Sequence, residues 1–96
     1  MSKITVVAKI RAKEESTETV KIELLKLVEP TRKEAGCIEY QLYQSIEEPS
    51  VFVFYENWES AAELEKHKNT DHYKSYTATI AGIIKERDVN KLTKIA

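Results

Sequence analysis

Three segments of the chain carry the apolar pattern of β-strands. Residues 3–11 and 38–43 alternate apolar and polar side chains with a period of two, which is typical of a strand with one buried face. In the second of these segments the apolar face holds Ile38, Tyr40 and Leu42. Residues 51–58 are the most apolar stretch of the chain, and a turn at residues 47–50 precedes them. A short fourth strand over residues 89–95 is predicted to close the chain.

Two stretches between these strands have apolar residues at helical spacing. The first opens at residues 14–16, and one of its faces holds Val20, Leu24, Leu27 and Val28. Gly36 is predicted to end this helix in the left-handed conformation that glycine adopts easily. The second stretch opens at Ser60 and Glu63, which have the spacing of a capping box, and residues 69–71 interrupt it. It resumes as a further helix whose apolar face holds Tyr73, Tyr76, Ile80, Ile83 and Ile84.

The order of these elements is β-α-β-β-α-β with the second helix broken. This order predicts a ferredoxin-like α+β fold, in which helices cover one face of an antiparallel sheet. The uncovered face of such a sheet is expected to be polar, yet residues 51–58 are apolar on both faces. The simplest cover is the sheet of a second copy, which predicts a homodimer built as a dimeric α+β barrel. The alternative is a strand with a few exposed apolar residues, which is ordinary.

The composition is that of one small globular domain, with 96 residues of which 42% are hydrophobic and 32% charged. Fifteen Lys and Arg residues against sixteen Asp and Glu residues give a net charge of −1, which argues against nucleic-acid binding. No apolar run approaches the roughly 20 residues that span a bilayer, and the first residues lack the pattern of a signal peptide. We therefore expect a single cytoplasmic domain over residues 1–96, with no membrane segment.

The residues with metal-binding or nucleophilic side chains do not form a known motif. His67 and His72 are five positions apart, whereas two ligands on one helix face stand three or four apart, so no metal site is predicted. Cys37 is the single cysteine; it has no evident activating base and no partner for an internal disulfide. Gly36 and Gly82 stand alone, so the chain has no phosphate-binding loop.

One group of residues combines a carboxylate and an imidazole with aromatic side chains, as a catalytic site would. Glu56 and Trp58 lie on one face of the third strand beside Phe54, and a carboxylate among aromatic rings is partly desolvated. His67 follows Leu64 by three positions, so it lies on the apolar face of its helix. An imidazole facing an aromatic pocket can act as a general base toward a phenol or an enol. The alternative is that Glu56 and His67 only satisfy hydrogen bonds inside a small core.

Three residues of the last helix stand near this group in the sequence. Tyr73 and Tyr76 are either core residues with hydroxyls at the rim or the mouth of the pocket. His72 opens the helix, where it either hydrogen-bonds backbone or contributes to substrate binding.

Three motifs resemble the antibiotic biosynthesis monooxygenase family of small dimeric α+β barrels. They are Arg-Lys-Glu-Ala-Gly-Cys-Ile-Glu-Tyr at residues 32–40, Phe-Tyr-Glu-Asn-Trp-Glu-Ser at 54–60, and Leu-Glu-Lys-His with Thr-Asp-His at 64–72. The resemblance implies a pocket between the helices and the sheet. It also argues against the haem-degrading branch, because His67 stands where that branch has Trp, Thr77 where it has its haem-binding His, and the first strand has no Asn.

The resemblance further implies a monooxygenase without a cofactor, acting with dioxygen on a small electron-rich aromatic such as a hydroquinone or phenol. His67 would remove the substrate proton and Glu56 would orient His67. The expected substrate-binding residues are Trp58, Phe54, Tyr76, Tyr73 and His72.

Two other functions remain open from the sequence. One is an isomerase of a small, perhaps phosphorylated, carbonyl compound that uses Arg11 or Lys66 for the anion. The other is a non-catalytic ligand-binding dimer.

Overall fold

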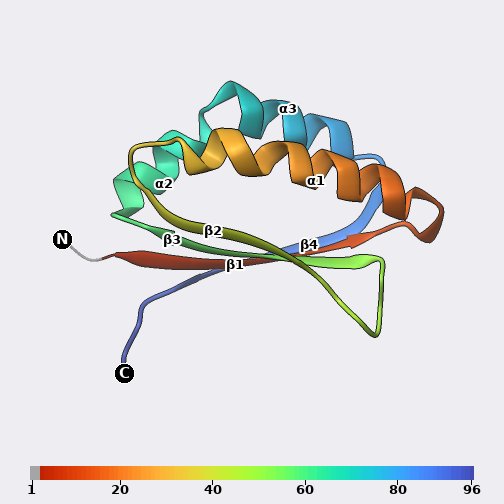
Figure 1. Ribbon diagram of the computed structural model, residues 1–96, viewed down its shortest axis with the longest axis horizontal. Helices are drawn as coiled ribbons and strands as arrows, with labels where there is room; N and C mark the ends of the chain where they lie inside the picture. Colours follow the sequence, from red (N-terminus) through yellow and green to blue (C-terminus); the bar gives the residue numbers. More distant parts are fainter. Residues whose placement is uncertain (1–2) are drawn as a thin grey trace.

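The chain folds as one antiparallel sheet with helices on one side (Figure 1). The computed structural model describes residues 3–96. In chain order the elements are β1 (Ile4–Ala12), the 3₁₀ helix η1 (Glu14–Ser16), α1 (Thr17–Arg32), β2 (Cys37–Gln44), β3 (Val51–Trp58), α2 (Ala61–Lys68), α3 (Asp71–Ile80) and β4 (Ile84–Leu92). The predicted ferredoxin-like α+β fold with a broken second helix is therefore confirmed.

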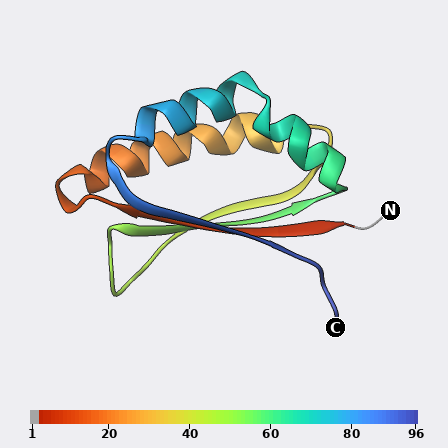
Figure 2. The ribbon, with the colours of Figure 1, turned by 180° about the vertical axis from the view of Figure 1, so that it is seen from behind.

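The strand order in the sheet is β2-β3-β1-β4, and every neighbouring pair is antiparallel. Helices α1, α2 and α3 all lie against the same face, and Figure 2 shows the opposite face without a helical layer. This arrangement leaves two boundaries where ligands or partners can approach. One is the space between the sheet and the helices, and the other is the uncovered face.

The core lies between the sheet and the helix layer. Alternate side chains of β1 and β3 point into it, and α1 contributes the face that its spacing predicts. Full burial of one large apolar side chain contributes roughly 1.5–3 kcal/mol, so this layer dominates the stability of the fold. Its largest fully buried apolar side chains are Ile10, Val20, Leu24, Phe52, Phe54, Trp58 and Ile80.

The last strand lies earlier in the chain than predicted, at Ile84–Leu92 rather than 89–95, and α3 ends at Ile80. Ile83 and Ile84 therefore belong to the turn and the strand, where both pack against the core. Their spacing fits either structure, and pairing with the end of β1 decides it, since Ile84 lies opposite Ala12. Residues 93–95 lie outside the strand because Leu92 already pairs with Thr5, near the start of β1.

Gly36 acts by its small size and not by a left-handed conformation. None of the glycines within residues 3–96 has a positive φ. A Cβ atom on Gly36 would lie 2.3 Å from the Cβ of Glu63, and the Gly36 carbonyl accepts a hydrogen bond from the N–H of Glu59 at 2.9 Å. The turn between α1 and β2 is thus held tightly against the start of α2.

Ile38 does not share a face with Tyr40 and Leu42 as its spacing predicts. The pairing of β2 with β3 shifts register between Cys37 and Glu39, and this bulge leaves Ile38 45% exposed.

Candidate active site

His67 is held in the core by the short helix α2. The side chain of Ser60 accepts a hydrogen bond from the N–H of Glu63, as the capping-box spacing predicts, and this fixes where the helix begins. From there Leu64 and His67 fall on the buried face. His67 is 2% exposed, which is rare for an imidazole unless its polar atoms have partners.

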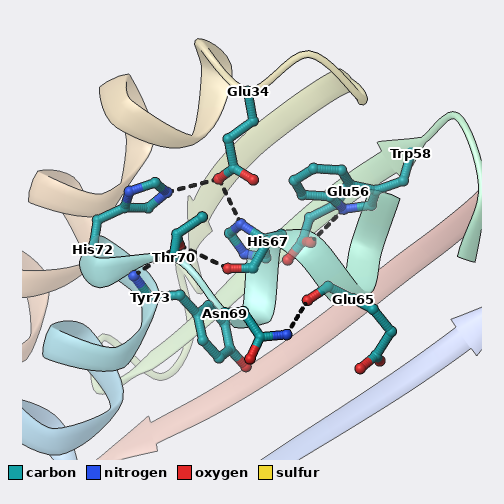
Figure 3. A network of polar contacts seen from close by, with 9 residues as sticks. All are labelled: Glu34, Glu56, Trp58, Glu65, His67, Asn69, Thr70, His72 and Tyr73. Atoms are coloured by element: carbon teal, nitrogen blue, oxygen red, sulfur yellow. Dashed lines mark hydrogen bonds and ion pairs between the residues drawn. The ribbon is translucent and has the colours of Figure 1, made fainter. Parts of the chain in front are cut away.

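The partner of His67 is Glu34, from the turn between α1 and β2. His67 Nδ1 lies 2.8 Å from Glu34 Oε2, and His72 Nε2 lies 2.7 Å from the same oxygen (Figure 3). An ionised carboxylate only accepts hydrogen bonds, so each imidazole donates an N–H hydrogen bond to Glu34. The three side chains come from three different elements: the α1–β2 turn, α2 and α3.

This hydrogen bond sets the tautomer of His67. With its proton on Nδ1, a neutral imidazole has a free lone pair on Nε2, on the other side of the ring. Within residues 3–96, Nε2 makes no hydrogen bond, and the one buried polar side-chain atom without a partner is Thr31 Oγ1. His67 Nε2 therefore contacts open space, and His67 is among the residues that line the cavity described below.

Glu56 forms a separate pair on β3. Its Oε1 accepts a hydrogen bond of 2.9 Å from the indole N–H of Trp58, and both side chains are buried. Burial raises the pKa of Glu56 from 4.5 to about 7, although the Trp58 hydrogen bond and the charge of Arg87 favour its ionised form. Glu56 was expected to orient His67, but the carboxylate bonded to His67 is Glu34.

Both groups face a cavity between the sheet and helices α2 and α3. Its empty space amounts to about 390 Å³, including the part that opens to solvent. The ring centroids of Trp58 and Tyr73 lie 4.6 and 4.8 Å from that of His67. The cavity is lined by Val6, Ala8, Tyr40, Phe54, Glu56, Leu64, His67, Lys68, Tyr73, Tyr76, Arg87, Val89 and Lys91.

The electrostatics of the cavity favour a neutral His67 and an anion beside it. Burial lowers the pKa of His67, and the hydrogen bond and charge of Glu34 raise it in part. Three cationic side chains line the same space: Lys68, Arg87 and Lys91. Arg87 also donates a hydrogen bond to the hydroxyl of Tyr73, which joins β4 to α3 across the mouth.

The structure brings together most of the residues singled out in the sequence. Phe54, Glu56, His67, Tyr73 and Tyr76 all line the cavity. Trp58 lies behind His67 and is not among the lining residues. His72 also lies outside the cavity, where its side chain contacts Glu34.

The basic residues considered for an anionic substrate lie elsewhere. Arg11 pairs with Glu48 and Glu86, and Lys66 pairs with Glu63 on the surface of α2.

Sequence reasoning missed Glu34, Tyr40 and Arg87 as site residues. Glu34 and Tyr40 lie inside the motif of residues 32–40, so the resemblance was a usable signal for them. Arg87 lies in a segment that was not predicted to be a strand, and its approach to the cavity follows from the pairing of Ile10 with Arg87.

The chain is thus a one-sided α+β domain whose helices cover an aromatic cavity, and a buried histidine bonded to a glutamate lines that cavity. The chain belongs to the antibiotic biosynthesis monooxygenase family, because the model of that family matches residues 3–79.

Individual relatives agree with this assignment. The chain is 32% identical to the probable quinol monooxygenase YgiN of Escherichia coli, with 93% of this chain and 95% of YgiN covered. It is 29% identical to the uncharacterized protein sll1783 of Synechocystis and spans only 63% of that protein's length. The crystal structure of PA3566 from Pseudomonas aeruginosa superimposes with a TM-score of 0.95 at 31% identity, covering 100% of this chain and 97% of that one.

No helix within residues 3–96 is both long enough and apolar enough to cross a membrane.

Proposed function

We propose that the protein is a monooxygenase that needs no cofactor and acts with dioxygen on a small phenol or hydroquinone. The observation that carries this proposal is the His67 imidazole, whose Nδ1 is bonded to Glu34, whose Nε2 makes no hydrogen bond, and whose ring lines an aromatic cavity. Family membership supports the reaction class, and the geometry supports the roles of the residues.

The first step is removal of the phenolic proton by His67 Nε2. The lowered pKa of His67 keeps the imidazole neutral near pH 7, so its lone pair is available. As the proton arrives, the ring becomes cationic and the Glu34 carboxylate at Nδ1 stabilises it. A base placed in this way contributes about 10²- to 10⁴-fold to the rate. The resulting phenolate lies near Lys68, Arg87 and Lys91, whose charges stabilise it.

The phenolate then reacts with dioxygen without an external reductant. It transfers one electron to dioxygen, and the phenoxyl radical and superoxide combine to form a carbon–oxygen bond at the ring. Protonation gives a hydroperoxide. The ring carbon that bears the hydroperoxide then loses its hydrogen as a proton. The electron pair of that bond forms a carbonyl group, and the outer oxygen leaves as water once it is protonated. In sum, a phenol plus dioxygen gives a quinone plus water. The substrate supplies all four electrons.

Glu56 supplies the proton that the departing oxygen needs. Its pKa of about 7 leaves it partly protonated at neutral pH, and it lines the same cavity as His67. A carboxylic acid kept protonated by burial is a common general acid. This role replaces the orienting role that the sequence suggested for Glu56.

The aromatic lining selects a flat substrate. Tyr40, Phe54 and Tyr76 offer ring faces or edges to a bound ring, and Trp58 supports His67 from behind. The Arg87–Tyr73 hydrogen bond joins β4 to α3 beside this space and would help to hold a bound ring in place.

We also propose that the protein is a homodimer that pairs through the uncovered sheet face. Apolar side chains cross this face from strand to strand, since Tyr43 lies opposite Val53 and Tyr55 opposite Val7. Tyr43 and Tyr55 are 58% and 37% exposed in the single chain. Two copies of this face would bury these side chains against each other.

Oxygen uptake with a panel of hydroquinones and phenols tests the reaction. We expect uptake above a protein-free blank for at least one compound, and its loss in His67→Ala. The control variant is Lys66→Ala, on the exposed side of the same helix, which should keep the activity of the unaltered chain. Uptake equal to the blank for every compound, or full activity in His67→Ala, contradicts the proposal.

A further inference from the structure

Glu34, His67 and His72 bring three metal-ligating atoms together beside the cavity. Glu34 Oε2, His67 Nδ1 and His72 Nε2 all lie within 4.8 Å of one another. The five-residue spacing of the histidines argued against a metal site only for ligands on one helix. Here His67 lies in the last turn of α2 and His72 in the first turn of α3, and the break at Asn69 and Thr70 turns both imidazoles toward the same carboxylate (Figure 3).

We propose that these three side chains form a binding site for a divalent transition-metal ion such as Zn²⁺. Two imidazoles and one carboxylate are a known ligand set for zinc. Ligand atoms around a tetrahedral zinc ion stand roughly 3.3 Å apart, given metal–ligand distances of about 2.0–2.1 Å. The two observed hydrogen bonds are 2.7 and 2.8 Å long, so the carboxylate must withdraw by about half an ångström to admit the ion.

The site can be reached from solvent without passing through the cavity. The side chain of His72 is 26% exposed, and His72 lines a shallow groove between α1 and α3 together with Glu23, Leu27 and Ser75. Neither Glu34 nor His72 lines the cavity. The ion would therefore enter from the groove, take water as a further ligand, and remain on the far side of His67 from the substrate.

Metal binding at this site would switch His67 off as a base. The ion takes the Nδ1 lone pair, so a neutral imidazole must carry its proton on Nε2, which faces the cavity. His72 likewise moves its proton from Nε2 to Nδ1. No proton is lost from either neutral ring. A substrate in the cavity would then face the N–H group of His67 Nε2 instead of a lone pair that can accept its proton. This consequence rests on the proposed function, whereas the binding itself does not.

Binding is tested by titrating the chain with Zn²⁺ alone. We expect saturable binding of one ion per chain by calorimetry. At a Zn²⁺ concentration ten times the dissociation constant, the thermal midpoint should rise by roughly 6–10 °C.

Two variants test whether the three residues hold the ion. His72→Gln keeps an N–H donor for Glu34 but removes the imidazole ligand, and Glu34→Gln removes the charged ligand. Both variants should lose the Zn²⁺-induced shift, whereas Glu65→Gln, an exposed carboxylate on α2, should keep it. An unchanged wild-type midpoint, or an equal shift in His72→Gln, overturns the site.

The switch is tested by turnover with and without Zn²⁺, compared within each variant. Inhibition of the wild type over the same concentration range as binding, with at least a tenfold weaker effect on His72→Gln, supports the switch. Binding without inhibition would leave the metal site standing and contradict the role of His67 as the base. Inhibition without binding at the three residues would contradict the metal site alone.

Discussion

The hydrogen bond from His67 Nδ1 to Glu34 decides which nitrogen of the imidazole meets the cavity. A sequence pattern identifies His67 through its spacing from Leu64, because helix periodicity is local. Glu34 lies 33 positions before His67, and only the packing of the α1–β2 turn on α2 brings the two together. The pair formed by Glu56 and Trp58 is the opposite case. The two residues are two positions apart on one strand, so local geometry alone brings their side chains together.

Glu34→Gln should lower kcat roughly 10- to 100-fold with little change in KM, because a neutral amide stabilises the imidazolium poorly. Glu34 also raises the pKa of His67, so the acid limb of the kcat/KM profile should move to lower pH in the variant. An acid limb that stays in place in Glu34→Gln while kcat falls would show that Glu34 does not act through His67.

Glu56→Gln should change how stability depends on pH. The pKa of Glu56 is raised by folding, so its contribution is fully present below about pH 4.5 and is lost as pH rises through 7. The amide keeps an acceptor for Trp58 but does not titrate. The free energy of unfolding of the variant relative to wild type should therefore increase by roughly 3 kcal/mol between pH 4 and pH 8. Denaturant unfolding across this range measures it, and parallel pH curves for the two proteins would contradict the raised pKa.

Among the elements, the α1–β2 turn has the largest effect on the site, because it carries Glu34. Patterning predicted that a helix ends here, but not that Gly36 is required by close contact with Glu63, since contacts across the fold leave no local trace. The predicted boundaries of β4 were wrong for the same reason. Ile83 and Ile84 fit a helix by spacing, and the pairing partner on β1 decides their structure.

Gly36→Ala should destabilise the fold by roughly 1–3 kcal/mol, because its Cβ would meet the Cβ of Glu63, which cannot move without the backbone. It should also reduce turnover by displacing Glu34. Gly82→Ala is the matched control, since a Cβ there meets nothing within 4 Å and should leave stability unchanged or slightly raised. Equal thermal midpoints for wild type and Gly36→Ala would contradict this account of the turn.

At the scale of the whole molecule, the order of elements and the one-sided sheet follow from periodicity, because each strand and helix must bury its apolar face. The apolar uncovered face was also visible in residues 51–58. What covers this face depends on association between chains, which a single chain does not show. The homodimer therefore stays a prediction.

Tyr55→Lys should convert the proposed dimer into a monomer. It places a charge at the centre of the uncovered face, next to Val7 on the neighbouring strand. Light scattering with size-exclusion chromatography should give twice 11.1 kDa for wild type and 11.1 kDa for the variant. Ile22→Lys, at an exposed apolar position on α1, should remain dimeric. A wild type that elutes as a monomer at all concentrations would contradict the dimer.

The measurement that most directly tests the central claim is turnover of an active phenol under ¹⁸O₂, with the product analysed by mass spectrometry. The account predicts that the product gains one ¹⁸O atom, that the other appears in water, and that His67→Ala abolishes this incorporation. Oxidation of the substrate without ¹⁸O in the product, or with release of hydrogen peroxide in place of water, would contradict a monooxygenase.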